Sequence, residues 1–193
     1  KKYHLIGIKK SMKTIKPLNL EIIETDLDCL STNEGILIVL ITPEGVMDPA
    51  ARRVNKLTRG SLTRLISSKK FKDADIGHLF QINFPDRCAA ERICVLKIGR
   101  RSSKATARKA GVAIAKMKGS VEILLALGNF PNLIELCKGV MLREYTFDIH
   151  KTELPIKLEG SFKIKIMHNN PETLTGELLE AKAIRTGFFS PDI

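Results

Sequence analysis

One uninterrupted apolar run does most to restrict how this chain can fold. Residues 35–42 read GILIVLIT, and no charged side chain interrupts the six apolar residues between the glycine and the threonine. A strand with one face in water alternates apolar and polar side chains, whereas this run is apolar throughout, so we predict a strand covered on both faces. Such strands belong to layered domains in which helices cover both sides of a sheet.

The remaining pattern predicts the other elements of a layered domain. Apolar and β-branched runs predict a half-buried strand at 18–25 and further strands near 76–84, 93–98 and 121–127. Helical periodicity predicts helices at about 104–118 and 131–145. A further long helix should begin after Asp48 as the N-cap, with Pro49 as its first residue, and extend to LTRLISSKKFK at 62–72. Its apolar stripe contains Ala50, Val54, Leu57 and Leu65. We predict an α/β fold of three layers, α/β/α, around a mixed, mostly parallel sheet.

The pattern changes after residue 153. Between 155 and 167 apolar residues alternate with lysines around a turn at 159–161, which predicts a hairpin or a pair of edge strands within 154–170. Residues 171–193 predict a last helix whose apolar side holds Leu174, Leu178, Ala181 and Phe188. Because such a stripe must be covered, we expect this helix to link the domain at 17–153 to a following one.

Composition narrows the class of protein. The chain has 193 residues, of which 44% are hydrophobic and 27% charged, enough for one large domain or one domain plus a linker helix. No window approaches the roughly 18 apolar residues of a membrane span. Residues 1–16 carry six lysines and no long apolar core, so we predict a basic extension and not a secretory signal. Met12 is an alternative native start, which would place residues 1–11 upstream of it.

Cysteine and histidine residues do not form a recognisable site in the sequence. Four cysteines and four histidines are scattered, without a C-x-x-C pair or zinc-finger spacing. We predict free, reduced thiols in a cytosolic protein and no metal site. No G-x-S-x-G, H-E-x-x-H or Cys-His arrangement is present either, so no catalytic residue is assigned.

The net charge of +11 is distributed in blocks along the chain. Residues 17–48 hold seven acids and no base, 49–72 hold eight bases and no acid, and 92–119 hold nine bases and no acid. Two helices with basic outer faces would form a positive surface able to attract phosphates. Residues 99–103, GRRSS, precede a predicted helix, whose N-terminus could bind an anion. The candidate nucleic-acid or anion contacts are Arg52, Lys56, Arg59, Arg100, Arg101, Lys104 and Arg108. The first three would share one helix face.

The alternative interpretation of these blocks is that they are solvated helix faces. Aromatic residues make up only 5% and no nucleic-acid-binding motif occurs, so any such binding would be directed to the phosphate backbone. The glycine in AGVAIA, residues 110–115, lies in mid-helix, and we interpret it as a small-residue helix face that packs close to a sheet.

Residues 135–152, ELCKGVMLREYTFDIHKT, carry the most specific motif. An apolar helical stripe is formed by Leu133, Leu136, Cys137, Val140 and Met141. The segment resembles the motif G-x-x-L-x-x-Y-x-F-D-x-Y-K that closes the N-terminal domain of the leucyl (cytosol) aminopeptidases. The matching residues are Gly139, Leu142, Tyr145, Phe147, Asp148 and Lys151, and His150 stands where the family commonly has tyrosine.

Other segments resemble the same family in the same order, so the resemblance covers roughly residues 17–193. The helix end at 62–72 resembles the family's helix and Phe-Lys turn, with Asp73 in place of a glycine. The strand RICVLKIG at 92–99 resembles the family's apolar strand, with residues 97–99 in place of G-L-G. The segment AKAIRTGFFSPDI at 181–193 resembles the helix that joins the domain to the catalytic one.

This resemblance implies a macro-domain-like fold and a non-catalytic role. The parent enzyme would be a cytoplasmic hexamer that releases N-terminal amino acids from peptides with two divalent metals, Zn or Mn, in a catalytic domain. The family's signature N-T-D-A-E-G-R is absent from this sequence, so we expect the chain alone to be inactive. Its implied partners are the catalytic domain, other copies of the parent and, since some bacterial members bind DNA, DNA. A macro-like fold also implies an ADP-ribose or nucleotide site as an alternative.

Overall fold

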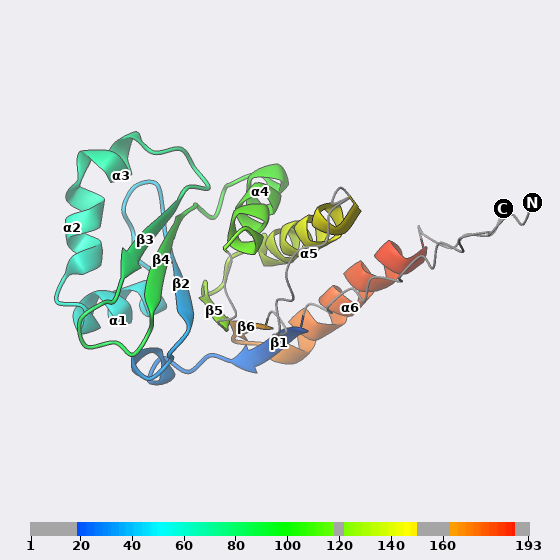
Figure 1. Cartoon of the computed structure of the whole chain (residues 1–193), viewed down its shortest axis with the longest axis horizontal. Helices are drawn as coiled ribbons and strands as arrows, with labels where there is room; N and C mark the ends of the chain where they lie inside the picture. Colours follow the sequence, from blue (N-terminus) through cyan, green and yellow to red (C-terminus); the bar gives the residue numbers. More distant parts are fainter. Residues whose placement is uncertain (1–18, 118–121, 150–162, 188–193) are drawn as a thin grey trace, which may run out of the picture.

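Six strands form one mixed sheet through the middle of the protein (Figure 1). The computed structural model describes residues 19–117, 122–149 and 163–187. The strands are β1 (Asn19–Glu24), β2 (Ile36–Ile41), β3 (Leu79–Asn83), β4 (Arg92–Lys97), β5 (Ile123–Ala126) and β6 (Lys163–His168). Their order is β1-β6-β5-β2-β4-β3, and every neighbouring pair is parallel except β3 with β4. The prediction of a mixed, mostly parallel sheet is confirmed.

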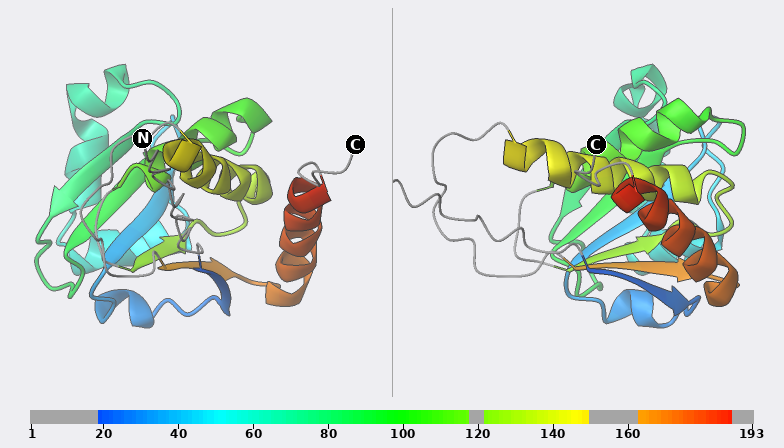
Figure 2. Two further views of the ribbon diagram at one scale, coloured as in Figure 1. Left: turned by 45° about the vertical axis from the view of Figure 1, so that its right-hand side comes forward. Right: turned by 90° about the vertical axis from the view of Figure 1, so that its right-hand side faces the viewer.

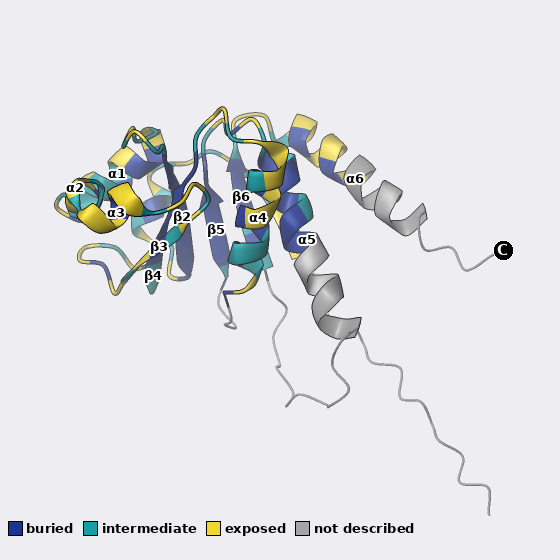
Figure 3. Ribbon diagram, turned by 90° about the horizontal axis from the view of Figure 1, so that it is seen from above, coloured by how far each residue is buried: buried dark blue, intermediate teal, exposed yellow. Residues whose placement is uncertain are grey.

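Helices cover both faces of this sheet and give three layers (Figures 1 and 2). One face packs against α4 (Lys104–Ala115), α5 (Leu133–Ile149) and α6 (Pro171–Gly187). The other packs against the short helix η1 (Cys29–Ser31) and α1 (Pro49–Leu57), α2 (Ser61–Ser67) and α3 (Lys69–Asp73). All six residues of β2 are buried, since alternate side chains enter the two apolar clusters. Figure 3 shows the central strands β2 and β5 buried between helices whose outer surfaces are exposed.

The helix predicted from Pro49 to residue 72 is three helices and not one. It begins as expected, since the Asp48 carboxylate accepts a hydrogen bond of 2.7 Å from the Ala51 N–H. It is interrupted after Leu57 because Arg59 and Gly60 adopt positive φ angles of 50° and 80°. The break redirects the chain, so Leu62 is fully buried while Leu57 and Leu65 are only half-buried.

A buried lysine holds α3 against the sheet. Lys97, at the end of β4, is 4% exposed. Its Nζ donates hydrogen bonds to the carbonyl oxygens of Phe71 (2.7 Å), Lys72 (3.2 Å) and Ala74 (2.6 Å) at the end of α3. It also lies 5.0 Å from the centroid of the Phe71 ring. Cations favour the carboxyl end of a helix, where backbone carbonyls have no partner within the helix.

Two glycines allow α4 and α5 to pack backbone against backbone. A Cβ atom at Gly111 would lie 2.0 Å from the Leu136 carbonyl oxygen, and one at Gly139 would lie 2.1 Å from the Arg108 carbonyl oxygen. The small-residue face predicted at 110–115 therefore meets a helix at Gly111, and not only the sheet. Of the C-terminal motif, the backbone up to Ile149 is helical, and His150 and Lys151 lie outside the described residues.

An ion-pair cluster joins the same two helices. Glu135 is 9% exposed and is paired with Arg108 of α4 and, at 2.9 Å, with Lys138 of α5. Burial works to raise the pKa of the Glu135 carboxyl, but the hydrogen bonds from the two cations outweigh it and hold the pKa below its usual range.

The prediction of edge strands in 154–170 is wrong for β6. This strand lies inside the sheet, parallel to both β1 and β5. Its lysines are partly exposed and pair with glutamates: Lys163 with Glu21 of β1 at 2.7 Å, and Lys165 with Glu122, directly before β5, at 2.7 Å. The alternation of apolar residues and lysines therefore reflects a solvated face of the sheet and not a position at its edge. The predicted turn at 159–161 lies outside the described residues.

The first turns of α6 are part of this domain. Leu174 and Leu178 are each 4% exposed and belong to the apolar cluster shared with α4 and α5. The domain's own sheet covers these two leucines, whereas the sequence had suggested that a following domain would cover them. The linker role of 171–193 stays a prediction, and the side chains of Ala181 and Phe188 lie outside the described part.

Candidate functional site

The chain connections diverge at the carboxyl ends of β2 and β5. These strands are neighbours, but the chain leaves β2 toward α1 on one face and leaves β5 toward α5 on the other. In open α/β sheets, ligands bind outside the carboxyl ends of strands where the connections diverge in this way. This edge is therefore the place where the fold favours a site.

Asp48 and Gly128 meet at this edge. The Asp48 Oδ1 caps α1, while its Oδ2 is buried and has no hydrogen-bond partner among the described residues. Gly128 follows β5 with φ of 55°, and a Cβ there would lie 2.9 Å from the Asp48 Oδ2. Burial raises the pKa of the Asp48 carboxyl, although the N–H groups of the helix and Arg52 oppose the shift. The sequence identified Asp48 as a helix cap but gave no sign of the unpartnered oxygen, which depends on the distant Gly128.

The loop predicted to bind anions uses its own polar groups internally. The Ser103 Oγ caps α4 by accepting a hydrogen bond of 3.1 Å from the Thr106 N–H. The Ser102 Oγ accepts from the Gly99 N–H at 3.1 Å, and the Asn132 Nδ2 donates to the Ser102 carbonyl oxygen at 2.7 Å. Arg100 and Arg101 are exposed at the same edge.

The predicted cations do not form one positive surface. Arg52 and Lys56 lie on α1, whereas Lys104 and Arg108 lie on α4, which covers the opposite face of the sheet. Arg59 lies in the break after α1, 3.5 Å from Asp86, and therefore does not share the helix face predicted for it. Arg108 is engaged by Glu135. The hypothesis of a joint basic surface over the two helices is wrong because the sheet separates them.

Thiols and metal ligands add no reactive group to this edge. All four cysteines are unpaired, and burial raises the pKa of Cys94 and of Cys137 to about 12, so both thiols are protonated at neutral pH. In the described residues no three His, Cys, Asp or Glu side chains come together as a metal site. The residues described here therefore do not fit the two-metal centre that the resemblance implies. In the same residues, no helix has the length and apolar character to cross a membrane.

Comparison with curated proteins finds two relatives with the same description. No protein-family model matches the chain. A protein of Cereibacter sphaeroides described as a probable cytosol aminopeptidase is 32% identical over 178 residues, which are 92% of this chain and 36% of the relative. A protein of Dinoroseobacter shibae with the same description is 32% identical over 128 residues, 66% of this chain and 26% of the relative. The chain thus spans only about a third of the curated relatives that it matches.

Comparison with solved structures places the fold. A tomato leucine aminopeptidase aligns with a TM-score of 0.65 and 16% identity, over 90% of this chain and 37% of that one. A macrodomain of Oceanobacillus iheyensis aligns with a TM-score of 0.57 and 11% identity, over 89% of this chain and 96% of that one. At such identities the alignments show the fold alone, and they confirm the predicted macro-like α/β/α architecture.

Proposed function

We propose that this chain, which corresponds to the N-terminal domain of the leucyl (cytosol) aminopeptidases, is a non-catalytic part of such an enzyme and serves its assembly or regulation. The parent would release N-terminal amino acids from peptides in the cytoplasm as a metal-dependent hexamer. The observation that carries this proposal is the match to 92% of the chain but only 36% of a probable cytosol aminopeptidase. Most residues of such an enzyme therefore lie outside the matched segment, and we assign its catalytic residues to them.

Two features of the chain support a non-catalytic role. The N-T-D-A-E-G-R signature does not occur in the sequence. The described residues also bring no metal-ligating cluster together, and two-metal peptide hydrolysis needs carboxylates converging on both ions. We therefore assign the two divalent ions, Zn or Mn, to the catalytic domain of the parent.

A feature of α6 supports contact with another domain. Leu179, one residue beyond the buried Leu178, is 60% exposed on the outer side of the helix. An apolar side chain on an otherwise polar face is suited to a contact with the catalytic domain or with another copy of the parent.

The proposal is tested by two measurements. This chain, incubated with leucine p-nitroanilide and either Mn²⁺ or Zn²⁺, should release no nitroaniline, and steady release would contradict a non-catalytic role. In the Cereibacter sphaeroides relative, deletion of the matching segment should lower the number of subunits per particle, obtained by dividing the molar mass from light scattering by the mass of the shortened subunit, or change the kcat. An unchanged number of subunits together with unchanged kinetics would remove the assembly or regulatory role.

Nucleotide binding at the carboxyl edge is the second candidate function. The buried, unpartnered Oδ2 of Asp48 favours it, since such an oxygen is suited to accept a hydrogen bond from a ligand. Calorimetry with ADP-ribose, on the chain and on Asp48→Ala, tests it, and an absence of heat would remove it. DNA binding, the remaining alternative, would have to use one face of the protein alone, because the sheet separates the basic helices.

A further inference from the structure

The outer edge of β3 leaves backbone groups available for another strand. β3 is the last strand of the sheet and pairs only with β4 in the described part of the chain. In an antiparallel pair, alternate residues direct their N–H and C=O groups toward the partner. The bond of 2.9 Å from the Phe84 N–H to the Glu91 carbonyl oxygen shows that the even-numbered residues face β4. The N–H and C=O groups of Leu79, Gln81 and Asn83 therefore point outward.

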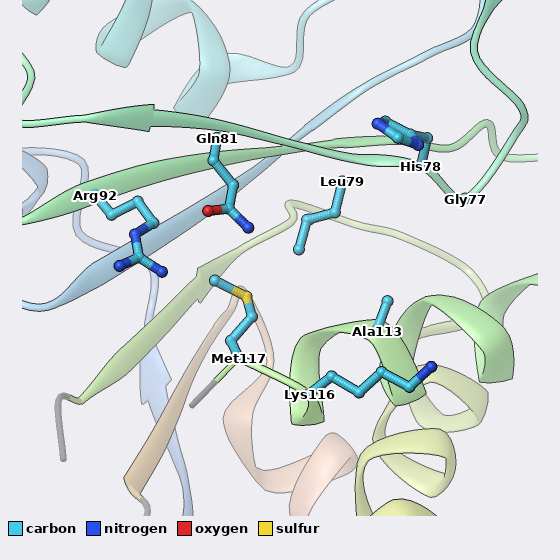
Figure 4. A pocket seen from close by; sticks show the side chains of 8 residues that line it. All are labelled: Gly77, His78, Leu79, Gln81, Arg92, Ala113, Lys116 and Met117. Carbon is cyan, nitrogen blue, oxygen red and sulfur yellow. The ribbon is translucent and has the colours of Figure 1, made fainter. Parts of the chain in front are cut away.

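A hollow lies beside this edge, between β3 and α4 (Figure 4). The hollow is open to solvent and has a volume of about 470 Å³. The lining residues include two cations, Arg92 and Lys116, and a histidine, His78, but no acid. Figure 4 shows Gln81 and Arg92 extending from the strands into the same space as Met117.

Arg92 has donors to spare. Its Nε is buried and has no hydrogen-bond partner among the described residues. Its Nη2 lies 3.5 Å from the Glu91 carboxylate, at the limit of a hydrogen bond. A guanidinium presents a planar fork that fits a carboxylate, and an unpartnered buried N–H is costly, so a carboxylate from a ligand would satisfy it.

From this arrangement we propose that the β3 edge and the adjacent hollow bind an extended acidic peptide by strand addition. The side chains of an added strand alternate between the two faces of the sheet. Those on the hollow side would meet Arg92 and Lys116 and should be carboxylates. Those on the other side would lie next to the half-buried Ile82 and should be apolar. The expected ligand thus alternates acidic and apolar residues.

Exposed apolar side chains at both ends of β3 extend this surface. Ile76, before the strand, is 54% exposed, and Phe84, directly after it, is 83% exposed with a positive φ of 46°. Open edge strands are usually blocked by charges or proline, and β3 carries neither. The edge is therefore built to accept a partner strand and not to repel one.

Charge complementarity favours an acidic peptide over a second copy of the chain. β3 reads LFQIN and would bring no carboxylate to the hollow of a symmetrical partner. Self-pairing would also place two chains of net charge +11 against each other. An acidic strand removes both difficulties. The peptide-binding proposal does not depend on the aminopeptidase role, so its failure would leave that role unaffected.

The probe is a blocked, fluorescein-labelled heptapeptide that alternates glutamate and valine, titrated with the full chain at low salt and followed by anisotropy. We expect saturable binding that weakens as salt increases. Arg92→Gln should weaken binding about tenfold, because charged hydrogen bonds are lost. Lys109→Gln, an exposed lysine of α4 that does not line the hollow, is the matched control and should bind like the parent chain.

The strand-addition geometry is tested separately. Gln81→Pro removes an outward N–H without removing a bond to β4, and edge strands tolerate proline at such positions, so the variant should fold. Because the lost N–H can no longer donate to the added strand, binding should weaken about tenfold. A peptide N-methylated at alternate amides tests the same geometry without altering the protein and should also bind poorly. Equal binding of a lysine–valine peptide, or full binding by Arg92→Gln and by the N-methylated peptide, would overturn the proposal.

Discussion

Lys97 shows how one residue can fasten an element to the sheet. A lysine is almost never fully buried unless its ammonium is satisfied, and here three carbonyl oxygens and an aromatic ring surround it. Those carbonyls belong to the end of α3, a helix of five residues that would be marginal by itself. The side chain therefore stabilises a segment whose own hydrogen bonds are few.

We expect Lys97→Met to destabilise the protein by about 2–3 kcal/mol, because it removes the donor from three carbonyl oxygens, of which that of Phe71 is buried. Urea denaturation followed by circular dichroism gives the free energy of unfolding. Lys70→Met, an exposed lysine of α3, is the control and should change stability by no more than about 0.5 kcal/mol. A Lys97→Met protein as stable as the control would show that the three bonds contribute nothing net.

At the scale of elements, the contact between α4 and α5 depends on the absence of two side chains. Alanine at Gly111 would place a Cβ 2.0 Å from a carbonyl oxygen, so the helices would have to separate. Separation would open the apolar cluster behind them and loosen the ion pairs of Glu135. The motif that carries the family resemblance thus includes Gly139 for a steric reason.

Gly111→Ala should cost about 3 kcal/mol or more, as overpacking of a close contact does. Gly176→Ala is the matched control, because Gly176 is also within a helix and a Cβ atom there would have no neighbour within 4 Å. It should gain about 0.5–1 kcal/mol through helix propensity. Thermal and urea denaturation of both variants give the comparison, and equal stabilities would contradict the close packing.

The sequence predicted the elements better than their connections. The five strands predicted before residue 153 correspond to β1–β5. They were predictable because burial on one or both faces of a strand produces an alternating or a continuous apolar pattern in the sequence. The break at Arg59 and Gly60 was missed, since the apolar stripe continues across it and Leu62 merely replaces its neighbours in the core. The basic residues were predicted to be exposed, but which face they occupy depends on the crossover after each strand. The local sequence pattern does not indicate to which face of the sheet each crossover leads.

At the scale of the whole molecule, β6 makes residues 163–168 indispensable to the fold. It lies between β1 and β5, and its removal would leave β1 without a partner and would detach β1 from β5 and the rest of the sheet. A chain that ends at residue 153 should therefore show no cooperative thermal transition by circular dichroism, whereas one that ends at residue 187 should unfold cooperatively. A sharp transition in the shorter chain would mean that the sheet is complete without β6.

The pairing of β1 with β6 also orders events during synthesis. The first strand of the sheet to leave the ribosome finds its partner in the last one, so the domain cannot close until β6 has emerged. Until then the apolar Leu20 and Ile22 have no cover. Pairing across such a sequence distance is slow. We therefore expect chaperones to bind the nascent polypeptide while β1 is unpaired.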